Sequence, residues 1–373
     1  MNSLKICVYA ICKNEAKFVD EWMDSMGEAD LVVVTDTGST DDTVEKLRAR
    51  GAVVHVNEVK PWRFDKARNI SLDHVPEDTD ICICTDLDEL FNAGWRKNLE
   101  EAWLNHQSSI KGPTAKCGRY LYNWSLKPDG SPDVQFVYFK VHERKDFSWK
   151  CPVHEYVSYD GPLPLEKIFI EGMVLSHYPD AEKSRGSYLP LLEMAVEEDP
   201  DSERMRYYLG REYMYKGHWQ NAIDTLIYFL NMPSATWREE RCAAMRWIAK
   251  SYHSLNDKAN AYRWYYKAIG EAPHLRDPYV EFATMCNDYR DWPAAYFLLQ
   301  EALKITEKSN VYVNMGYSWD HTPHDLCAIA AFNIGLVDIS LEHAKKAYEI
   351  APDIERLKNN ITAIEKVIES KKL

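Results

Sequence analysis

The sequence has little positive charge, no long apolar run and no close cysteine pair of the kind that binds zinc. Its 373 residues include 45 lysines and arginines against 58 aspartates and glutamates, which gives a formal net charge of −13. A nucleic acid or an anionic membrane as main partner needs a basic face, so both classes are disfavoured. An acidic chain can still bind one nucleotide through a metal ion and a few local cations.

Membrane insertion and disulfide bonding are also disfavoured. The first apolar run, Ile6 to Ile11, is too short for a secretory leader and is followed at once by polar residues. No run approaches the length needed to cross a bilayer. The nine cysteines are odd in number and lie scattered from Cys7 to Cys327, which indicates reduced thiols. We therefore expect a cytoplasmic protein without a membrane span.

Up to about residue 180, short apolar runs alternate with amphipathic stretches. Strands are predicted over 5–12, 31–35, 53–56 and 81–85, and helices over 15–26 and 41–50. This alternation is typical of βαβ units around a mainly parallel sheet, whose ligands bind beyond the carboxyl ends of the strands. Polar clusters follow three of the predicted strands at those ends: Lys13-Asn14-Glu15, Asp36-Thr37-Gly38-Ser39 and Asp86-Leu87-Asp88-Glu89.

From about residue 186 onward the pattern predicts helices alone. Small residues and a proline recur at steps of 12, 7 and 5 residues, as in the series Ala249, Ala261, Ala268 and Pro273. Small residues at these offsets let two antiparallel helices approach closely, and the proline ends the second helix. The steps resemble the tetratricopeptide pattern, although the repeat starts are spaced unevenly, by 39, 34 and 45 residues. An irregular helical bundle is the alternative.

Asp86 and Asp88 follow the apolar strand predicted over 81–85. With Glu89 they concentrate negative charge that a divalent cation would neutralise. Oxygen ligands suit Mg²⁺ or Mn²⁺, which would bridge to a diphosphate. A solvated acidic turn is the structural alternative.

Asp36 ends the second predicted strand. Most of the segment after it is explained by local structure, because Gly38 supports a tight turn, Ser39 can cap the next helix and Asp41 complements the dipole of that helix. Asp36 itself precedes the turn. A carboxylate in that position can accept a hydrogen bond from a base imide or a ribose hydroxyl.

Taken in order, Cys12-Lys13-Asn14-Glu15, Asp36-x-Gly38-Ser39-x-Asp41 and Asp86-x-Asp88 resemble the motifs of family 2 glycosyltransferases with the GT-A fold. One subgroup also has elements similar to Trp62-x-Phe64-Asp65-x-Ala67-Arg68-Asn69, Val153-His154-Glu155 and His177. Its members include peptide glycosyltransferases that modify bacteriocins, and they carry tetratricopeptide-like tails. The resemblance implies a Rossmann-like α/β GT-A catalytic domain over 1–185 and an all-α helical-repeat domain over 186–373.

The resemblance also implies a nucleotide-sugar site. Asp36 would contact the base, taken as uracil, while Asp86 and Asp88 would hold the diphosphate through Mn²⁺ or Mg²⁺. His154 or His177 would complete the metal shell or neutralise the departing diphosphate. The remaining residues assigned to nucleotide binding are Asn14, Glu15, Arg68, Asn69, Lys183 and Arg185. For the last two, an ordinary exposed linker is the alternative.

The reaction implied is a single displacement with inversion, which needs a base for the acceptor and positive charge on the leaving diphosphate. Glu155 is the predicted base. The acidic pair common among relatives is absent, so Asp133 and Glu143 remain alternatives, as does a buried structural pair of His154 with Glu155. Aromatic residues between 120 and 160, Trp124 and Trp149 among them, are a candidate platform for a peptide or glycan acceptor.

The predicted function is therefore the transfer of a hexose from a UDP-sugar to a peptide or glycan, with no nucleic-acid partner. The helical tail would bind the acceptor or pair two subunits as a homodimer. A non-catalytic scaffold with an inactive GT-A domain is the main alternative. A nucleotidyltransferase would need a glycine-rich, basic triphosphate loop, and the first strand here runs into Lys13-Asn14-Glu15 instead.

Overall fold

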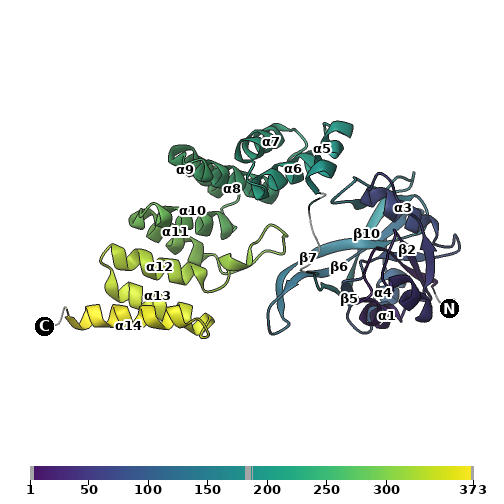
Figure 1. Ribbon diagram of the computed structural model, residues 1–373, viewed down its shortest axis with the longest axis horizontal. Coiled ribbons are helices and arrows are strands. Elements are labelled where there is room, and N and C mark those ends of the chain that lie inside the picture. The colour runs from purple at the N-terminus through teal and green to yellow at the C-terminus, as the bar shows by residue number, and fades with distance from the viewer. Residues whose placement is uncertain (1–3, 181–185, 187, 371–373) are drawn as a thin grey trace. The chain divides into compact units, whose positions relative to one another are not determined.

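The computed structural model describes residues 4–180, 186 and 188–370. The chain divides into two compact units, Met1–Glu198 and Asp199–Leu373 (Figure 1). Helix α5 (Tyr188–Glu198) belongs to the first unit. The boundary expected between residues 185 and 186 comes before this helix, and the point at which a catalytic domain ends stays a prediction.

The first unit is an α/β domain whose strands and helices alternate in its first half. Before α5 it contains, in chain order, β1 (Ile6–Cys12), α1 (Val19–Met26), β2 (Leu31–Asp36), α2 (Thr43–Ala49), β3 (Val53–Val56), α3 (Phe64–Asp73), β4 (Ile81–Cys84), β5 (Glu89–Phe91), α4 (Trp95–Leu104), β6 (Ala115–Leu126), β7 (Pro132–His142), β8 (Phe147–Lys150), β9 (Tyr156–Tyr159) and β10 (Leu165–His177). The elements predicted up to residue 85 are therefore present, with ends that differ by a few residues.

One eight-stranded sheet organises this unit, in the order β3-β2-β1-β4-β7-β6-β10-β5, and β8 pairs with β9 in a small second sheet. The first four strands are parallel, with Cys12 of β1 opposite Asp36 of β2. The carboxyl ends of β1 and β2 thus share one edge, as the sequence predicts. Helices α1, α2 and α4 pack on one face of the sheet through side chains such as Trp22 and Trp95. Helix α3 and β8 cover the other face.

Two of the antiparallel pairings in the rest of the sheet bring later residues to the end of β4. Strand β7 pairs with β4 so that Val141 lies opposite Ile83, and the preceding residue, Lys140, therefore comes at the carboxyl end of β4. Strand β5 pairs with β10 so that Glu89 lies opposite His177. The acidic segment after β4, residues 86–89, thus lies beside β7 and β10, which come much later in the sequence.

The second unit is built of antiparallel helix pairs stacked in sequence order. Its elements are α6 (Glu203–Tyr215), α7 (Trp219–Asn231), α8 (Arg238–Ser254), α9 (Lys258–Glu271), α10 (Asp277–Asp288), α11 (Trp292–Lys304), the short 3₁₀ helix η1 (Gly316–Ser318), α12 (Thr322–Asn333), α13 (Val337–Ile350) and α14 (Glu355–Ser370) (Figure 1). Each of these α-helices packs on the next along the chain.

The small residues of the predicted repeat are the contact points between paired helices. Ala249, Ala261 and Ala268 are fully buried in the α8–α9 pair. At the same place in the first pair, a Cβ atom on Gly210 would lie 2.5 Å from the side chain of Leu226. The helical-repeat architecture is therefore confirmed.

Segment 305–321 accounts for the longest of the three repeat spacings. It connects α11 to α12 and runs back over α10 and α8. Arg246 of α8 donates to the carbonyl of Val313 at 3.3 Å and pairs with Glu281 of α10. Asp277 of α10 accepts from the backbone amide of Met315 at 2.7 Å. Arg246 and Asp277 are almost completely buried, so these contacts are made inside the unit.

All nine cysteines are free thiols, and eight of them are buried, in agreement with the expectation of reduced core residues. Among the described residues, none of the helices combines the length and the apolar character required to cross a bilayer.

Candidate functional site

Asp36 lies buried at the end of β2 and holds the turn that follows it. Its Oδ1 accepts from the backbone amides of Gly38 and Ser39, each at 3.0 Å, and its Oδ2 accepts from the hydroxyl of Ser39. Gly38 has a φ of 109°, a conformation that favours glycine. The carboxylate therefore shapes the loop at the sheet edge. Its predicted contact with a nucleotide base stays a prediction.

Asn14 and Glu15 fasten the loop after β1 to this turn. Asn14 has a φ of 55°, and its side-chain oxygen accepts from the amide of Thr40 at 2.8 Å. The backbone amide of Glu15 donates to the hydroxyl of Thr43 at 2.8 Å, and the Glu15 side chain is 8% exposed. Both residues thus join the two loops into one rigid edge, and their predicted role in nucleotide binding stays a prediction.

Asp86 is bound by an arginine of α3, the helix on the face of the sheet opposite to α1, α2 and α4. Arg68 projects from α3, donates from Nη2 to Asp86 Oδ1 at 2.8 Å and donates from Nε to Glu155 Oε1 at 2.6 Å. Its guanidinium also lies 5.0 Å from the ring of Trp149. Burial by itself would lower the pKa of Arg68, but the charges of Asp86 and Glu155 raise it well above its ordinary value.

Lys140 is a second cation on Asp86, and the sequence analysis did not include it. Its Nζ lies 3.4 Å from Asp86 Oδ2 and 3.3 Å from Glu89 Oε2. Glu89 also accepts from the hydroxyl of Tyr122 at 2.7 Å and from the backbone amide of Asp86 at 2.9 Å. Burial lowers the pKa of Lys140, yet the charges of Asp86 and Glu89 outweigh it and the pKa lies well above its usual value.

A signal for Lys140 exists in the sequence. It stands within the apolar run Phe136-Val137-Tyr138-Phe139-Lys140-Val141. A lysine in an apolar strand either faces solvent or, if it is buried, needs a carboxylate partner. The sequence alone does not say which of the many acidic residues is that partner.

Asp88 and His177 form the second part of the site. His177 Nε2 lies 3.7 Å from Asp88 Oδ2, and the amide of Tyr178 donates to the backbone oxygen of Asp88 at 2.7 Å. Burial alone would lower the pKa of His177, but the interaction with Asp88 raises it above the ordinary value. The ring of Trp124 lies 5.0 Å from that of His177. His177 thus lies beside the acidic motif, and its predicted role at a metal ion or a diphosphate stays a prediction.

The candidates for the base occupy different parts of the domain. Glu155 precedes β9 and is bound by Arg68, so it joins Asp86, Arg68, Lys140 and Glu89 in one group, the Asp86 cluster. Asp133 lies in the β6–β7 hairpin, where it accepts from the hydroxyl of Ser125 at 3.0 Å. Glu143 follows β7 at the amino end of β4, the opposite edge from Asp86. Of the three, Glu155 is the one that the structure groups with the acidic motif.

The remaining predicted site residues have varied positions. The Asn69 side chain pairs with both backbone groups of Trp149 in β8, at 2.7 and 2.9 Å. The ring of His154 packs edge-on against Tyr188 of α5 at 5.6 Å. Lys183 and Arg185 lie outside the described residues.

Trp149 corrects one interpretation made from the sequence. It is 2% exposed and donates from Nε1 to the hydroxyl of Tyr9 at 2.8 Å, so it belongs to the core and not to an acceptor platform. Trp124 is 43% exposed beside His177 and retains that interpretation.

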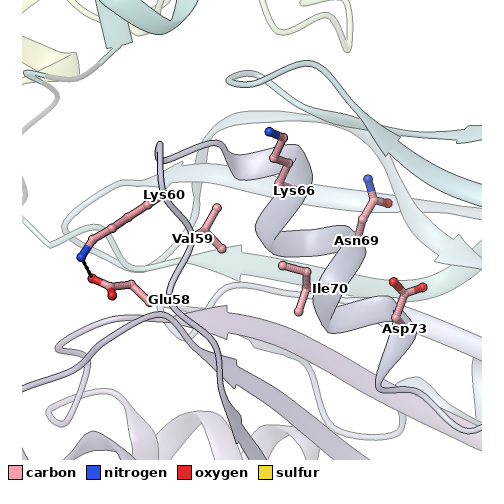
Figure 2. A pocket seen from close by; sticks show the side chains of 7 residues that line it. All are labelled: Glu58, Val59, Lys60, Lys66, Asn69, Ile70 and Asp73. Atoms are coloured by element: carbon pink, nitrogen blue, oxygen red, sulfur yellow. Dashed lines mark ion pairs between the residues drawn. The ribbon is translucent and has the colours of Figure 1, made fainter.

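A surface hollow of about 380 Å³ lies between α3 and the segment before it, lined by Glu58, Val59, Lys60, Lys66, Asn69, Ile70 and Asp73 (Figure 2). The Lys60 ammonium is paired with Glu58 at 2.5 Å. Helix α3 lines the hollow with Lys66, Asn69, Ile70 and Asp73, whereas its buried Arg68 is not part of the lining. The acidic residues after β4 do not line the hollow either. It is therefore a feature separate from the Asp86 cluster.

Residues 7–159 match the family model described as Glycosyl transferase family 2. The segment that matches the family 2 model includes every residue of the Asp86 cluster and ends before β10, which contributes His177. A search of curated proteins found no match.

Solved structures similar to this chain cover its helical part. The MamA protein is 17% identical over 45% of this chain and 83% of its own, with a TM-score of 0.36. The TPR protein YrrB is 15% identical over 48% and 84%, with a TM-score of 0.39. TTC0263, a TPR protein of Thermus thermophilus, is 18% identical over 47% and 88%, with a TM-score of 0.34. TM-scores this low carry no argument about the fold, so the helical-repeat assignment is based on the helix pairs observed in this chain.

Proposed function

We propose that the domain that matches the family 2 model is an inverting glycosyltransferase that moves a sugar from a UDP-sugar to a peptide or glycan acceptor. The observation that carries the proposal is the cluster at the carboxyl end of β4, where Asp86, Arg68 and Glu155 are linked side by side and Asp88 faces His177. Ligands of open parallel sheets bind at that edge.

The charge balance of the cluster favours a metal-bound diphosphate. Four carboxyl groups, those of Asp86, Asp88, Glu89 and Glu155, lie with the two cations Arg68 and Lys140. The carboxyl groups outnumber these cations, so a free diphosphate would be repelled. A divalent cation would cancel the excess and let the diphosphate approach.

Asp88 and His177 are the donors that fit such a cation. A carboxylate oxygen and an imidazole nitrogen lie 3.7 Å apart, and both are accepted ligands of Mn²⁺. Among the described residues no group of three or more His, Cys, Asp or Glu side chains is arranged to hold a metal. Two protein ligands are enough for Mg²⁺ or Mn²⁺ when phosphates and water fill the other positions. The bound cation would supply positive charge to the leaving diphosphate.

Glu155 is the residue we propose as the base. Arg68 holds its Oε1 at 2.6 Å and thereby fixes the carboxylate next to Asp86. A base fixed beside the donor site can take the proton of an acceptor hydroxyl as the new bond forms. A thiol acceptor would need it less, because thiols ionise more readily.

The test is a calorimetric titration of UDP and then GDP, with and without Mn²⁺, on the wild-type protein and on Asp88→Ala. The proposal predicts Mn²⁺-dependent binding of UDP that is lost in the variant. Asp133→Ala, which removes a carboxylate of the β6–β7 hairpin, is the matched control and should bind UDP normally. Hydrolysis of UDP-glucose, UDP-galactose and UDP-N-acetylglucosamine would then identify the sugar.

Failure of a well-folded wild-type protein to bind either nucleotide would overturn the proposal and favour the scaffold alternative. Pyrophosphate release from a nucleoside triphosphate and a sugar phosphate would favour the nucleotidyltransferase alternative. Acceptor binding or homodimerisation through the helical unit and a cytoplasmic location stay predictions.

A further inference from the structure

Lys140 enters the function proposed above only as a counter-charge, and it is as deeply buried as Arg68. The residue is 4% exposed, and its Nζ reaches Asp86 Oδ2 at 3.4 Å and both oxygens of Glu89 at 3.3 and 3.4 Å. So little exposed surface leaves no room for direct contact with a substrate. Its effect on chemistry must therefore act through the carboxylates that it binds.

The two cations hold Asp86 from different directions. Arg68, from α3, takes Oδ1 at 2.8 Å, while Lys140, from β7, takes Oδ2 at 3.4 Å. A carboxylate held at both oxygens is fixed in rotation about its Cβ–Cγ bond. The backbone amide of Asp86 is also fixed, because it donates to Glu89, which Lys140 binds as well.

We propose that Lys140 is a positioning residue of the donor site, one that sets the orientation of Asp86 and of the loop running to Asp88 without touching the donor. This inference rests on the proposed function, in which Asp88 and His177 would hold the cation of a metal-bound diphosphate beside Asp86. It differs from a purely structural role, in which Lys140 would serve only to neutralise the buried charge of Glu89.

A pair of variants separates the two roles. Lys140→Met keeps most of the length of the side chain and removes its charge, which leaves Glu89 without its cation and should destabilise the fold. Lys140→Met combined with Glu89→Gln removes both charges and should recover most of the melting temperature. If Lys140 positions Asp86, the double variant regains stability but still binds UDP with Mn²⁺ about 10- to 100-fold more weakly than wild type.

Calorimetric titration of UDP at saturating Mn²⁺ provides the readout, together with the Mn²⁺ concentration that gives half-maximal UDP binding. Lys167→Met is the matched control, since Lys167 on β10 lies near the ring of Phe139 in the same sheet. Recovery of wild-type UDP affinity in the double variant would overturn the inference and assign Lys140 to charge neutralisation alone.

Failure of the proposed function gives a different result. In that case the wild-type protein itself shows no Mn²⁺-dependent binding of UDP. If the wild type binds and the double variant binds equally well, the donor site stands and the positioning role of Lys140 is wrong.

Discussion

Arg68 and Glu155 lie 87 positions apart in the sequence, and the Nε of Arg68 donates to Oε1 of Glu155 at 2.6 Å. The same guanidinium binds Asp86, so one side chain joins the proposed base to the proposed diphosphate site. Arginine suits this bridging role because its planar fork presents donors to two carboxylates at once. A displacement of α3 would therefore disturb both halves of the reaction together.

Glu155→Gln tests the base directly. Glutamine retains an oxygen that can accept from Arg68, but it cannot take a proton from the acceptor. We expect the rate of UDP-sugar turnover to fall about 10²- to 10⁴-fold, while the affinity for UDP with Mn²⁺ stays near that of wild type. Glu171→Gln, on the exposed side of β10, is the control. Unchanged turnover in Glu155→Gln would exclude Glu155 as the base.

His177→Ala tests the proposed cation site from the imidazole side. Because Asp88 and His177 would share one cation, we expect the Mn²⁺ concentration for half-maximal UDP binding to rise about tenfold or more. The effects of His177→Ala and Asp88→Ala should also be far from additive, since either variant removes part of the same site. Simple additivity of the two changes in binding free energy would argue for separate roles.

His142 should make the stability of the fold depend on pH. It is fully buried, Tyr9 donates to its Nε2 at 2.8 Å, and its Nδ1 donates to the carbonyl of Glu143 at 2.6 Å. Burial lowers the pKa of His142 in the fold from 6.5 to about 4. Between these two pH values His142 is protonated in the unfolded chain but neutral in the folded chain. The free energy of unfolding therefore decreases as the pH falls from about 6.5 toward 4.

The expected size follows from about 1.4 kcal/mol for each pKa unit, which gives about 2 kcal/mol lost between pH 7 and pH 5. Urea unfolding at these two pH values measures the free energy. His142→Gln, which has no group that titrates in this range, should lose about 2 kcal/mol less over the same interval. Parallel curves for wild type and variant would show that His142 does not control this dependence.

Two identical glycine substitutions should have opposite effects on the helical unit. Gly210→Ala places a Cβ 2.5 Å from Leu226, and overpacking of this kind costs about 1–3 kcal/mol. Gly270→Ala, in α9, meets no atom within 4 Å, and replacing a helical glycine by alanine contributes up to about 1 kcal/mol. Thermal unfolding of both variants gives the comparison. Equal stabilisation by the two substitutions would contradict the proposed close contact of α6 and α7.

Much of the fold is predictable from the sequence, because its first half obeys local rules. Alternating apolar runs locate β1, β2, β3 and β4, and the parallel arrangement places their polar ends on one edge. The spacing of Ala249, Ala261 and Ala268 likewise reports the close approach of paired helices, since only small side chains fit there.

The part of the site that depends on antiparallel pairing is not predictable in this way. Lys140 meets Asp86 because β7 runs against β4, and no local pattern fixes that register. Trp149 is an aromatic residue of the kind that binds sugars and peptides, yet it is buried in the core and donates a hydrogen bond to Tyr9. Such outcomes depend on contacts between distant segments, which a single sequence does not encode in its periodicity.

The connection between α11 and α12 also changes how the second unit responds to stress. In a simple helical solenoid each repeat contacts only its neighbours, so the ends can fray one pair at a time. Here the segment 305–321 contacts α8 and α10 through Arg246, Glu281 and Asp277, and thus ties the end of the α10–α11 pair back to α10 and to the preceding α8–α9 pair. We therefore expect the pairs α8–α9 and α10–α11 to unfold together as one cooperative block, which would make this part of the array stiffer than a simple solenoid.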